Sequence, residues 1–380
     1  MTRIRTTHTG SLPRPPEILE AVRAHFSTGE PMNEEVLASA VAEIVRKQVE
    51  AGIDIITDGE MSKPSFFHYL AERLGGFEPR APQKASPLGP VDPNGRDALM
   101  FPDYYRGMLE HSPFANTIRV TPRVCVGPVK YVGRKFVERD IANLKRAMAA
   151  AGAKEAFMPA ASPLPFMPNE HYKSDEEYFE AYGEVMREEY KAILGAGFYL
   201  QIDDPRMVSN WDSHKEMDLK QYRAWMQKRI AHLNHALRGL PAEQIRYHTC
   251  YGVNFGPRLS DLQLEDVLDL IFTINVGAYS FEAANPRHDH EWRVLGRVAL
   301  PAGKRLIPGA ITHSNVTVEH PEVVADRIER WAKAAGPQNV LFGNDCGFSS
   351  TAGNTEIPES VAWAKLRALA EGARIASRRL

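Results

Sequence analysis

The chain has 380 residues, 46 of them basic and 48 acidic, which gives a formal net charge of −2 at pH 7. Apolar residues make up 43% of the sequence. This value is typical of soluble globular proteins, and it excludes a disordered chain, a collagen-like fibre and a disulfide-stapled scaffold. With a charge near zero and no blocks of Lys or Arg, we expect no nucleic-acid partner and no binding to membrane surfaces.

The cysteines and the N-terminal segment indicate the cellular compartment in which we expect the protein. The three cysteines, Cys125, Cys250 and Cys346, are few and odd in number, which favours a reducing compartment over a disulfide framework. The N-terminal segment lacks the apolar core of a signal peptide, and no run approaches the roughly 18 apolar residues of a transmembrane helix. We therefore expect a cytoplasmic protein.

Short apolar runs alternate with longer amphipathic segments along the chain. The runs that we predict as strands are residues 4–7, 53–57, 156–160, 198–202, 245–249, 274–279, 305–311 and 340–343. The segments that we predict as helices are residues 34–51, 175–194, 217–237, 321–335 and 359–377. Eight strands with helices between them predict an α/β fold, a (β/α)8 TIM barrel that comprises residues 1–380. A doubly wound open sheet is the alternative, but no G-x-G-x-x-G turn follows any of these strands.

Residues 75–137 interrupt this alternation, and we predict them as an insertion between strands two and three. The part up to about residue 116 is rich in Pro, Gly and aromatic residues, and residues 118–132 alternate in the manner of a β-hairpin. Long insertions in barrels often act as lids or binding loops at the active face. A contact between copies of the chain, in a homo-oligomer, is an equally good interpretation.

Polar residues follow most of the predicted strands, at the rim where TIM barrels build their active sites. They are residues 8–11, 58–60, 203–205 and 248–250, Glu282, residues 313–314 and residues 344–346. Two of the three cysteines, three histidines and several carboxylates therefore gather on one rim.

The most informative of these segments contains His248 and Cys250. Side chains two residues apart in a strand point to the same side, roughly 6–7 Å apart, so both can reach one ion. Cys346 ends the last strand, and Glu282 follows strand six, between the other two strands. One imidazole, two thiolates and one carboxylate form a tetrahedral set suited to Zn²⁺. For the H-x-C motif alone, a buried histidine beside an inert cysteine is the simpler interpretation, and the position of Cys346 favours the metal.

A sulfur-rich zinc site favours attack by a thiol over hydrolysis. Two thiolates and a carboxylate offset the charge of the ion, which then activates water poorly but holds an incoming thiol as a nucleophilic thiolate. The H-E-x-x-H helix of hydrolytic zinc peptidases is absent. We therefore expect the transfer of a carbon group to a substrate sulfur.

Six motifs give the chain a resemblance to a known family. They are TTHTGS, GIDIITDGE, GFYLQIDDP, YHTCYGVNFG, GAITHSNV and FGNDCG, in this order. The chain resembles the catalytic C-terminal barrel of cobalamin-independent methionine synthase and its short single-barrel relatives, a superfamily that includes zinc-dependent alkyltransferases. The resemblance implies a zinc-dependent methyl transfer to a small-molecule thiol, homocysteine giving methionine, with a methyl donor as second partner.

The resemblance also implies roles for individual residues. The zinc ligands that it implies are His248, Cys250, Glu282 and Cys346. The loop that receives the carboxylate of homocysteine is Thr9, Gly10 and Ser11, and the acids that hold the ammonium group are Glu60 and Asp203. His313 matches the proton donor for the departing folate amine, a role that suits an imidazole with an ordinary pKa of about 6.5.

The half of the motif set that would bind the methyl donor departs from the family pattern. The second acidic residue of that pattern falls near Ser209, its stacking tryptophan has only Phe166 as a counterpart, and its R-C-V segment is replaced by residues 123–125. The donor therefore stays open between a folate, a methyl-corrinoid protein, a methoxy-aromatic compound and an epoxide.

Other interpretations stay open as well. The distance in sequence from Cys250 to Glu282 is longer than in the family, and the residues that could replace Glu282 are His288, Asp289, His290 and Glu291. Asp58 and Glu60 could be the acid and base of a glycosidase. A barrel that binds zinc or a thiol without catalysis is a further alternative, and the presence of His313 argues against it.

Overall fold

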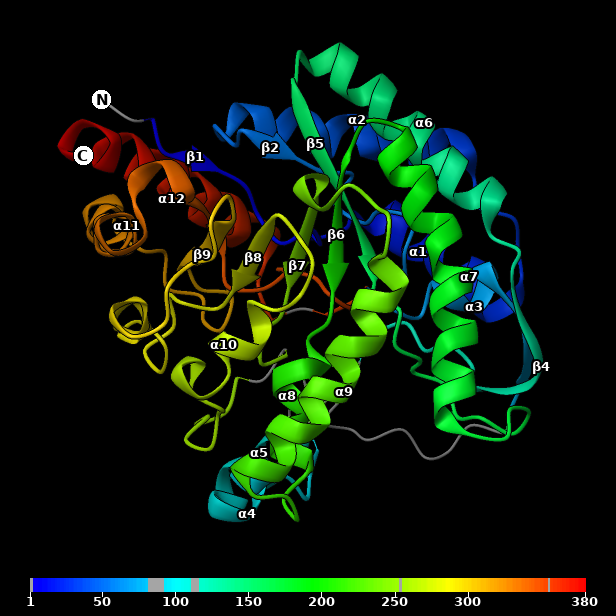
Figure 1. The fold of residues 1–380 in the computed structure, drawn as a ribbon. Helices are drawn as coiled ribbons and strands as arrows, with labels where there is room; N and C mark the ends of the chain where they lie inside the picture. Colours follow the sequence, from blue (N-terminus) through cyan, green and yellow to red (C-terminus); the bar gives the residue numbers. More distant parts are fainter. Residues whose placement is uncertain (1–2, 81–91, 111–115, 253–254, 355) are drawn as a thin grey trace.

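Eight parallel strands form the centre of the protein. The computed structural model describes residues 3–80, 92–110, 116–252, 255–354 and 356–380. The strands lie in the order β1, β10, β9, β8, β7, β6, β5, β2. Their bounds are Arg5–Thr6, Leu341–Asn344, Arg305–Ile311, Ala278–Phe281, Ile245–His248, Tyr199–Asp203, Glu155–Ala161 and Ile55–Ile56, in the same order. At the two ends of this order, the amide of Asp54 donates to the carbonyl of Thr6 at 3.2 Å. The barrel is therefore nearly closed, and the predicted (β/α)8 fold is confirmed (Figure 1).

Helices surround the strands (Figure 1). The α-helices outside the insertion are α1 (Pro16–Thr28), α2 (Glu34–Glu50), α3 (Leu70–Arg73), α6 (Arg134–Ala151), α7 (Asp175–Gly195), α8 (Arg206–Ser213), α9 (Leu219–Leu237), α10 (Leu268–Ile271), α11 (Pro321–Ala335) and α12 (Glu359–Arg379). The 3-10 helices are Ala242–Gln244, Leu264–Asp266, Glu291–Gly296 and Pro337–Asn339. Side-chain caps fix several starts, since Asn33 accepts from two amides of α2, Ser174 caps α7, and Asp218 forms a capping box with Gln221 at α9.

The predicted strands and helices form within a few residues of their expected bounds, with one larger shift. The sixth strand was expected at residues 274–279 and forms at Ala278–Phe281. Ile274 and Val276 are buried in the core before the strand begins, and the Tyr279 hydroxyl donates to the carbonyl of Ile274 at 3.0 Å. Apolar residues in a buried turn carry the same sequence signal as a buried strand.

The described residues between α3 and α6 form a two-stranded antiparallel sheet and two short helices. They are β3 (Leu74–Pro79), α4 (Arg96–Met100), α5 (Pro102–Glu110) and β4 (Arg123–Tyr131). The expectation that residues 118–132 form a hairpin by themselves is wrong, because they supply the single strand β4, which pairs with β3. The Gly127–Pro128 step is an irregularity opposite Gly76, where an added Cβ would lie 2.5 Å from the carbonyl oxygen of Pro128.

Two of these helices lie at the carboxyl ends of the barrel strands. In Figure 1, the arrowhead of β6 points toward the side where α4, α5 and α8 lie. Arg96 of α4 donates to the carbonyls of His214 and Met217 at 2.9 and 2.8 Å, just after α8. The insertion therefore reaches the rim where the polar residues gather.

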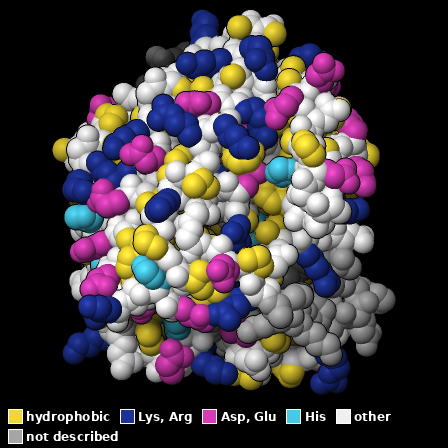
Figure 2. All heavy atoms as spheres, turned by 90° about the vertical axis from the view of Figure 1, so that its right-hand side faces the viewer, with side chains coloured by type: hydrophobic (Ala, Val, Ile, Leu, Met, Phe, Trp, Pro, Cys, Tyr) yellow, Lys and Arg dark blue, Asp and Glu magenta, His cyan; other side chains and the backbone are white. Residues whose placement is uncertain are grey.

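The surface and the barrel interior differ in how they place charge. On the face drawn in Figure 2, basic and acidic side chains alternate, and neither sign gathers in one area of the described residues. Within the described part of the chain, no helix is long and apolar enough to cross a membrane.

Inside the barrel, buried Arg246 stacks on Phe157 at 3.6 Å and donates to Gln201 at 2.7 Å. Gln201 in turn donates to Asp203 and to the carbonyl of Thr9, so this layer is the floor of the rim above it.

Candidate active site

One imidazole and two thiols meet at the carboxyl ends of β7 and β10. His248 ends β7, Cys250 follows it by two residues, and Cys346 follows β10 by two residues. The two sulfur atoms lie 3.2 Å apart, and one ligand atom from each of the three residues lies within 4.8 Å of the others. The Nδ1 atom of His248 lies 3.2 Å from the Ser280 hydroxyl, and its buried Nε2 atom has no hydrogen-bonding partner among the described residues.

The protonation states of this cluster suit a metal ion. Burial and the nearby charge of Arg246 lower the pKa of His248 to about 3, so its imidazole is neutral, the form that binds metals. The hydrogen bond with Cys250, together with burial, raises the pKa of Cys346 well above its ordinary value. A divalent cation reverses such a shift, because it stabilises the thiolate. An unpartnered buried nitrogen beside two sulfurs in contact is therefore an arrangement that could hold a metal ion.

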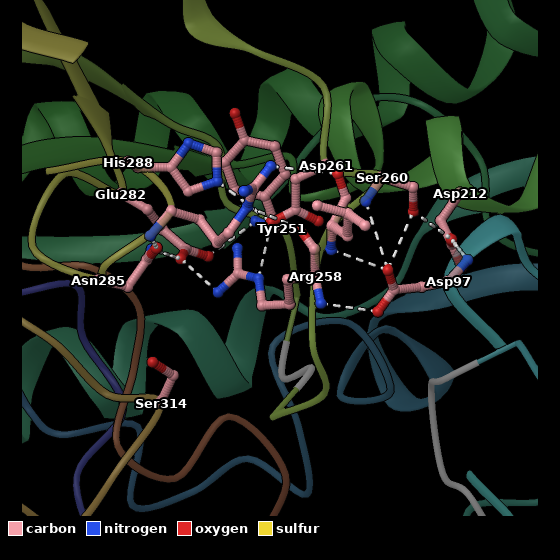
Figure 3. A network of polar contacts seen from close by, with 12 residues as sticks. Asp97, Asp212, Tyr251, Arg258, Ser260, Asp261, Glu282, Asn285, His288 and Ser314 are labelled. Carbon is pink, nitrogen blue, oxygen red and sulfur yellow. Dashed lines mark hydrogen bonds and ion pairs between the residues drawn. The ribbon is translucent and has the colours of Figure 1, made fainter. Parts of the chain in front are cut away.

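Glu282, the predicted fourth ligand, belongs to a neighbouring cluster. One oxygen of Glu282 lies within 4.8 Å of ligand atoms of His313 and Asp345. Its carboxylate accepts hydrogen bonds from the amide of Tyr251 at 2.8 Å, from Arg258 at 2.9 Å and from Asn285 at 2.8 Å (Figure 3). The charge of Glu282 acts on both His248 and Cys346, so the two clusters are adjacent.

Arg258 keeps Glu282 ionised. Burial by itself raises the pKa of Glu282, but the positive charge of Arg258, which also donates a hydrogen bond to it, is the largest of the effects that bring it down to about 2. Arg258 is held by Asp261 at 2.7 Å and by Asp97 of α4, which accepts its amide at 2.7 Å (Figure 3). The insertion thereby fixes the arginine that holds this carboxylate.

The residues considered as replacements for Glu282 are engaged in other contacts. His288 lies 3.1 Å from Asp261 and 2.9 Å from Glu291, stacks on Tyr251, and keeps a pKa raised to about 9 against the effect of burial. Asp289 pairs with Arg327 at 3.2 Å, and His290 is exposed.

A cavity of about 460 Å³ opens onto the imidazole and thiol cluster. The predicted site residues that line it are Thr9, Ser11, Glu60, Asp203, His248, Cys250 and Cys346. Gly10 lies between two lining residues, whereas Glu282 and His313 are not part of the wall. The structure thus brings most of the predicted site residues together around one cavity.

Glu60 and Asp203 form a pair of carboxylates on this wall. Both are buried, at 2% and 5% exposure. Burial raises the pKa of each, and the charge of Glu60 raises the pKa of Asp203 further. The Oε2 atom of Glu60 has no partner among the described residues, and Asp203 accepts a hydrogen bond from Gln201 at 2.7 Å. Two buried carboxylates that repel each other beside a cavity favour a cationic ligand between them.

The segment from Thr9 to Ser11 is fixed by close packing. The Thr9 amide donates to the side chain of Asn344 at 2.8 Å. Gly10 has φ +140°, and an added Cβ would lie 3.0 Å from an oxygen of Glu60. At Gly347 an added Cβ would lie 2.0 Å from the Ser11 hydroxyl. The loops that follow β1 and β10 therefore pack so closely on their neighbours that a side chain at Gly10 or Gly347 would collide with them.

His313 follows β9 by two residues and does not line the cavity. It is 1% exposed, its ring lies edge-on to Phe255 with 6.0 Å between centroids, and burial lowers its pKa. The negative charge of Glu282 opposes that shift.

The other end of the cavity is aromatic, and sequence reasoning missed most of it. Phe66, Phe67, Arg206, Ser209 and Trp211 line this end. Phe166, the expected counterpart of the family's tryptophan, stacks on Phe67 with 4.8 Å between centroids. The nearest sequence signal for Arg206 and Trp211 is their place in the helix that directly follows the strand ending at Asp203.

Comparisons with known proteins agree with the fold and the motifs. Residues 4–94 match the family described as cobalamin-independent synthase, catalytic domain. The methionine synthase of Sulfurisphaera tokodaii is 25% identical over 97% of this chain and 91% of its own length, and that of Sulfolobus acidocaldarius is 24% identical over 98% and 92%. A B12-independent methionine synthase from Shewanella sp. W3-18-1, solved with selenomethionine, superimposes with a TM-score of 0.72 at 23% identity, covering 99% of this chain and 98% of that one. The predicted resemblance to this family is confirmed.

Proposed function

We propose that this chain, which resembles the cobalamin-independent methionine synthases along nearly its whole length, is a zinc-dependent transferase that methylates the thiol of homocysteine. The observation that carries the proposal is the position of His248, Cys250 and Cys346 on the wall of the cavity that also bears Glu60 and Asp203. Soft ligands for a metal and a pair of carboxylates for an amine thus face one space.

The donor set fits zinc. His248, Cys250 and Cys346 would hold the ion, and Glu282 is the predicted fourth ligand, because nitrogen and sulfur donors in a tetrahedral set are those that Zn²⁺ prefers. Bound there, zinc supplies the positive charge that keeps a substrate thiol deprotonated near neutral pH.

The chain's own residues bind and orient the amino acid. Glu60 and Asp203 accept the ammonium group, which offsets the repulsion between the two carboxylates. The Ser11 hydroxyl lines the cavity and is not used by any hydrogen bond that the structure gives for the described residues, so it can donate to the substrate carboxylate. These contacts place the thiol beside Cys250 and Cys346.

His313 is the residue that we assign to proton transfer to the leaving group. Because burial lowers its pKa, the resting imidazole is neutral, and the imidazolium needs a nearby negative charge. Ionised Glu282, whose carboxylate lies within 4.8 Å of the ring nitrogen, supplies that charge.

A cysteine variant tests the proposal. Cys346→Ser should lose both stoichiometric zinc, measured by elemental analysis, and methyl transfer to homocysteine from a panel of a methyl-folate, a methyl-corrinoid protein and methoxy-aromatic acids. The control is Cys125→Ser, which changes a buried cysteine of β4 outside the cavity and should keep both. Retention of zinc and activity by Cys346→Ser would refute the proposal.

The same chemistry with a donor other than folate is the second candidate. It is favoured by the neutral Ser209 on the cavity wall, where the family pattern has an acid that touches the pterin. Full turnover with a methyl-folate and homocysteine would eliminate it. Steady turnover with any donor would in turn eliminate a barrel that only binds zinc or a thiol.

A further inference from the structure

The aromatic end of the cavity holds one basic side chain. Among the described residues that line the cavity, Arg206 is the only arginine or lysine. It is the first residue of α8 and directly follows Pro205. Its guanidinium group lies over the ring of Phe166 at 4.0 Å, and 5.9 Å from the ring centroid of Phe67.

The guanidinium is held by its face and not by its N–H groups. In the part of the chain that the structure describes, no hydrogen bond and no ion pair is found for the Arg206 side chain, whose contacts are the two phenylalanine rings. Burial lowers its pKa to about 10, so the group is still charged at pH 7. A stacked guanidinium with open N–H edges can receive a carboxylate through two parallel hydrogen bonds.

The local charges leave this cation uncompensated. The charged side chains that act on Arg206 are Arg229, which disfavours its charge, and Asp204, which favours it without forming an ion pair with it. One carboxylate between two guanidinium groups leaves a net positive charge. Neither Glu60 nor Asp203 is among the charges that act on Arg206.

Three further acids line the cavity, and each already accepts a hydrogen bond; the first, Asp92, accepts the amide of Asn94 at 2.8 Å. Asp212 accepts the amide of Asp97 at 2.9 Å, and Asp261 pairs with Arg258 at 2.7 Å. Among the described residues of the wall, Arg206 is therefore the only basic side chain, and Glu60 has a buried carboxylate oxygen without a partner.

We propose that Arg206 determines the specificity for the second substrate by binding its carboxylate, while the planar or apolar part of that substrate lies against Phe66 and Phe67. This inference rests on the proposed function only in taking the second substrate to be the methyl donor. It assigns the donor to the class of carboxylate-bearing aromatic or apolar molecules.

Benzoate and benzamide test the assignment, because they share a planar ring and differ in charge. Their dissociation constants would be measured by calorimetry on the zinc-loaded protein saturated with homocysteine, which occupies the thiol end. Wild type should bind benzoate about tenfold more tightly than benzamide, the effect of one charge-assisted hydrogen-bonded pair. Equal affinities, or no saturable binding of benzoate, would overturn the proposal.

Three variants locate the effect. Arg206→Gln should abolish the preference for benzoate, and Arg206→Lys should restore part of it, since Lys keeps the charge without the stacked fork. Arg229→Gln removes the same charge from a side chain that does not line the cavity, and it should keep the preference. If Arg229→Gln alone loses the preference for benzoate, the overall positive potential near the cavity selects the anion, and not a direct contact with Arg206. That outcome would contradict the proposal.

A parallel titration with homocysteine separates the two carboxylates that could reach Arg206. If Arg206→Gln weakens homocysteine binding and leaves benzoate binding unchanged, then Arg206 holds the carboxylate of the thiol substrate and the proposal is wrong. These measurements need no turnover. Because benzoate and benzamide binding can also be measured on the protein without zinc and homocysteine, failure of the zinc and methyl-transfer test in Cys346→Ser would leave the benzoate result as an independent outcome.

Discussion

At the thiol end of the cavity, the groups that face a ligand stand at the ends of barrel strands, whereas at the aromatic end they stand on α8 and on the segment before α3. The thiol end is fixed by backbone approaches at Gly10 and Gly347 and by the floor around Arg246. The aromatic end is held by ring stacking among Phe67, Phe166 and Arg206. A helix or loop side chain can change without disturbing the barrel, so the aromatic end is where the donor can differ among relatives of one fold.

The largest effect is expected at the carboxylate pair of the thiol end. Glu60→Gln keeps the shape of the side chain and removes half of the ammonium site, so KM for homocysteine should rise about ten- to a hundredfold, the value of one lost charge-assisted hydrogen bond. The measurement is KM for homocysteine beside KM for 4-mercaptobutanoate, which lacks the amine and should respond little. Equal increases for both thiols would show that Glu60 does not hold the ammonium group.

A backbone variant tests whether the thiol end is as rigid as its packing indicates. Gly10→Ala places a Cβ at φ +140°, 3.0 Å from Glu60 and 3.2 Å from Pro159. It should lower the free energy of unfolding by about 1–3 kcal/mol, measured in urea. Gly107→Ala in α5 is the control, because an added Cβ there meets no atom within 4 Å, and the change should be neutral or slightly stabilising. A neutral Gly10→Ala would contradict the comparison between the two ends.

The same difference explains which parts of the site the sequence could predict. The ends of the strands are predictable because each strand is a short apolar run that stops at polar residues. The run predicted at residues 305–311, for example, coincides with β9. The clustering of His248, Cys250 and Cys346 follows from barrel geometry once the strands are in order.

Contacts made by helices and by the insertion had no such signal. An amphipathic pattern indicates that one face of α8 is buried, but it does not indicate that Arg206 faces a cavity. Asp97 and the amide of Arg258 are 161 residues apart in the chain, and neither lies in a periodic segment that predicts their contact. The alternation of residues 118–132 predicted a hairpin, whereas the Gly127–Pro128 step is an irregularity within the single strand β4, and a bulge within a strand and a hairpin turn use the same residue types.

The smallest effect on the site itself is expected from Glu356, a partly buried acid that does not line the cavity. Glu356 follows the cavity-lining segment of Ser350 and Thr351. Burial raises its pKa to about 8 from 4.5, although Asn354 donates to it at 2.6 Å. Between these two pH values the folded protein keeps a proton that the unfolded chain releases, so the free energy of unfolding falls as pH rises through this window.

Replacing Glu356 by a group that does not ionise should remove this pH-dependent fall in the free energy of unfolding. Glu356→Gln should be more stable than wild type at pH 9 by a few kcal/mol at most, since the side chain is partly exposed, and the difference should vanish near pH 4. Urea unfolding at several pH values measures it, with Glu20→Gln, whose side chain is 76% exposed, as the control for the change in net charge. Burial also raises the pKa of Glu60, but there a bound ammonium group can offset the shift, so added homocysteine should stabilise wild type and leave the Glu356 contribution unchanged. A stabilisation by Glu356→Gln that is the same at all pH values would show that packing, and not the buried charge, decides the stability of this segment.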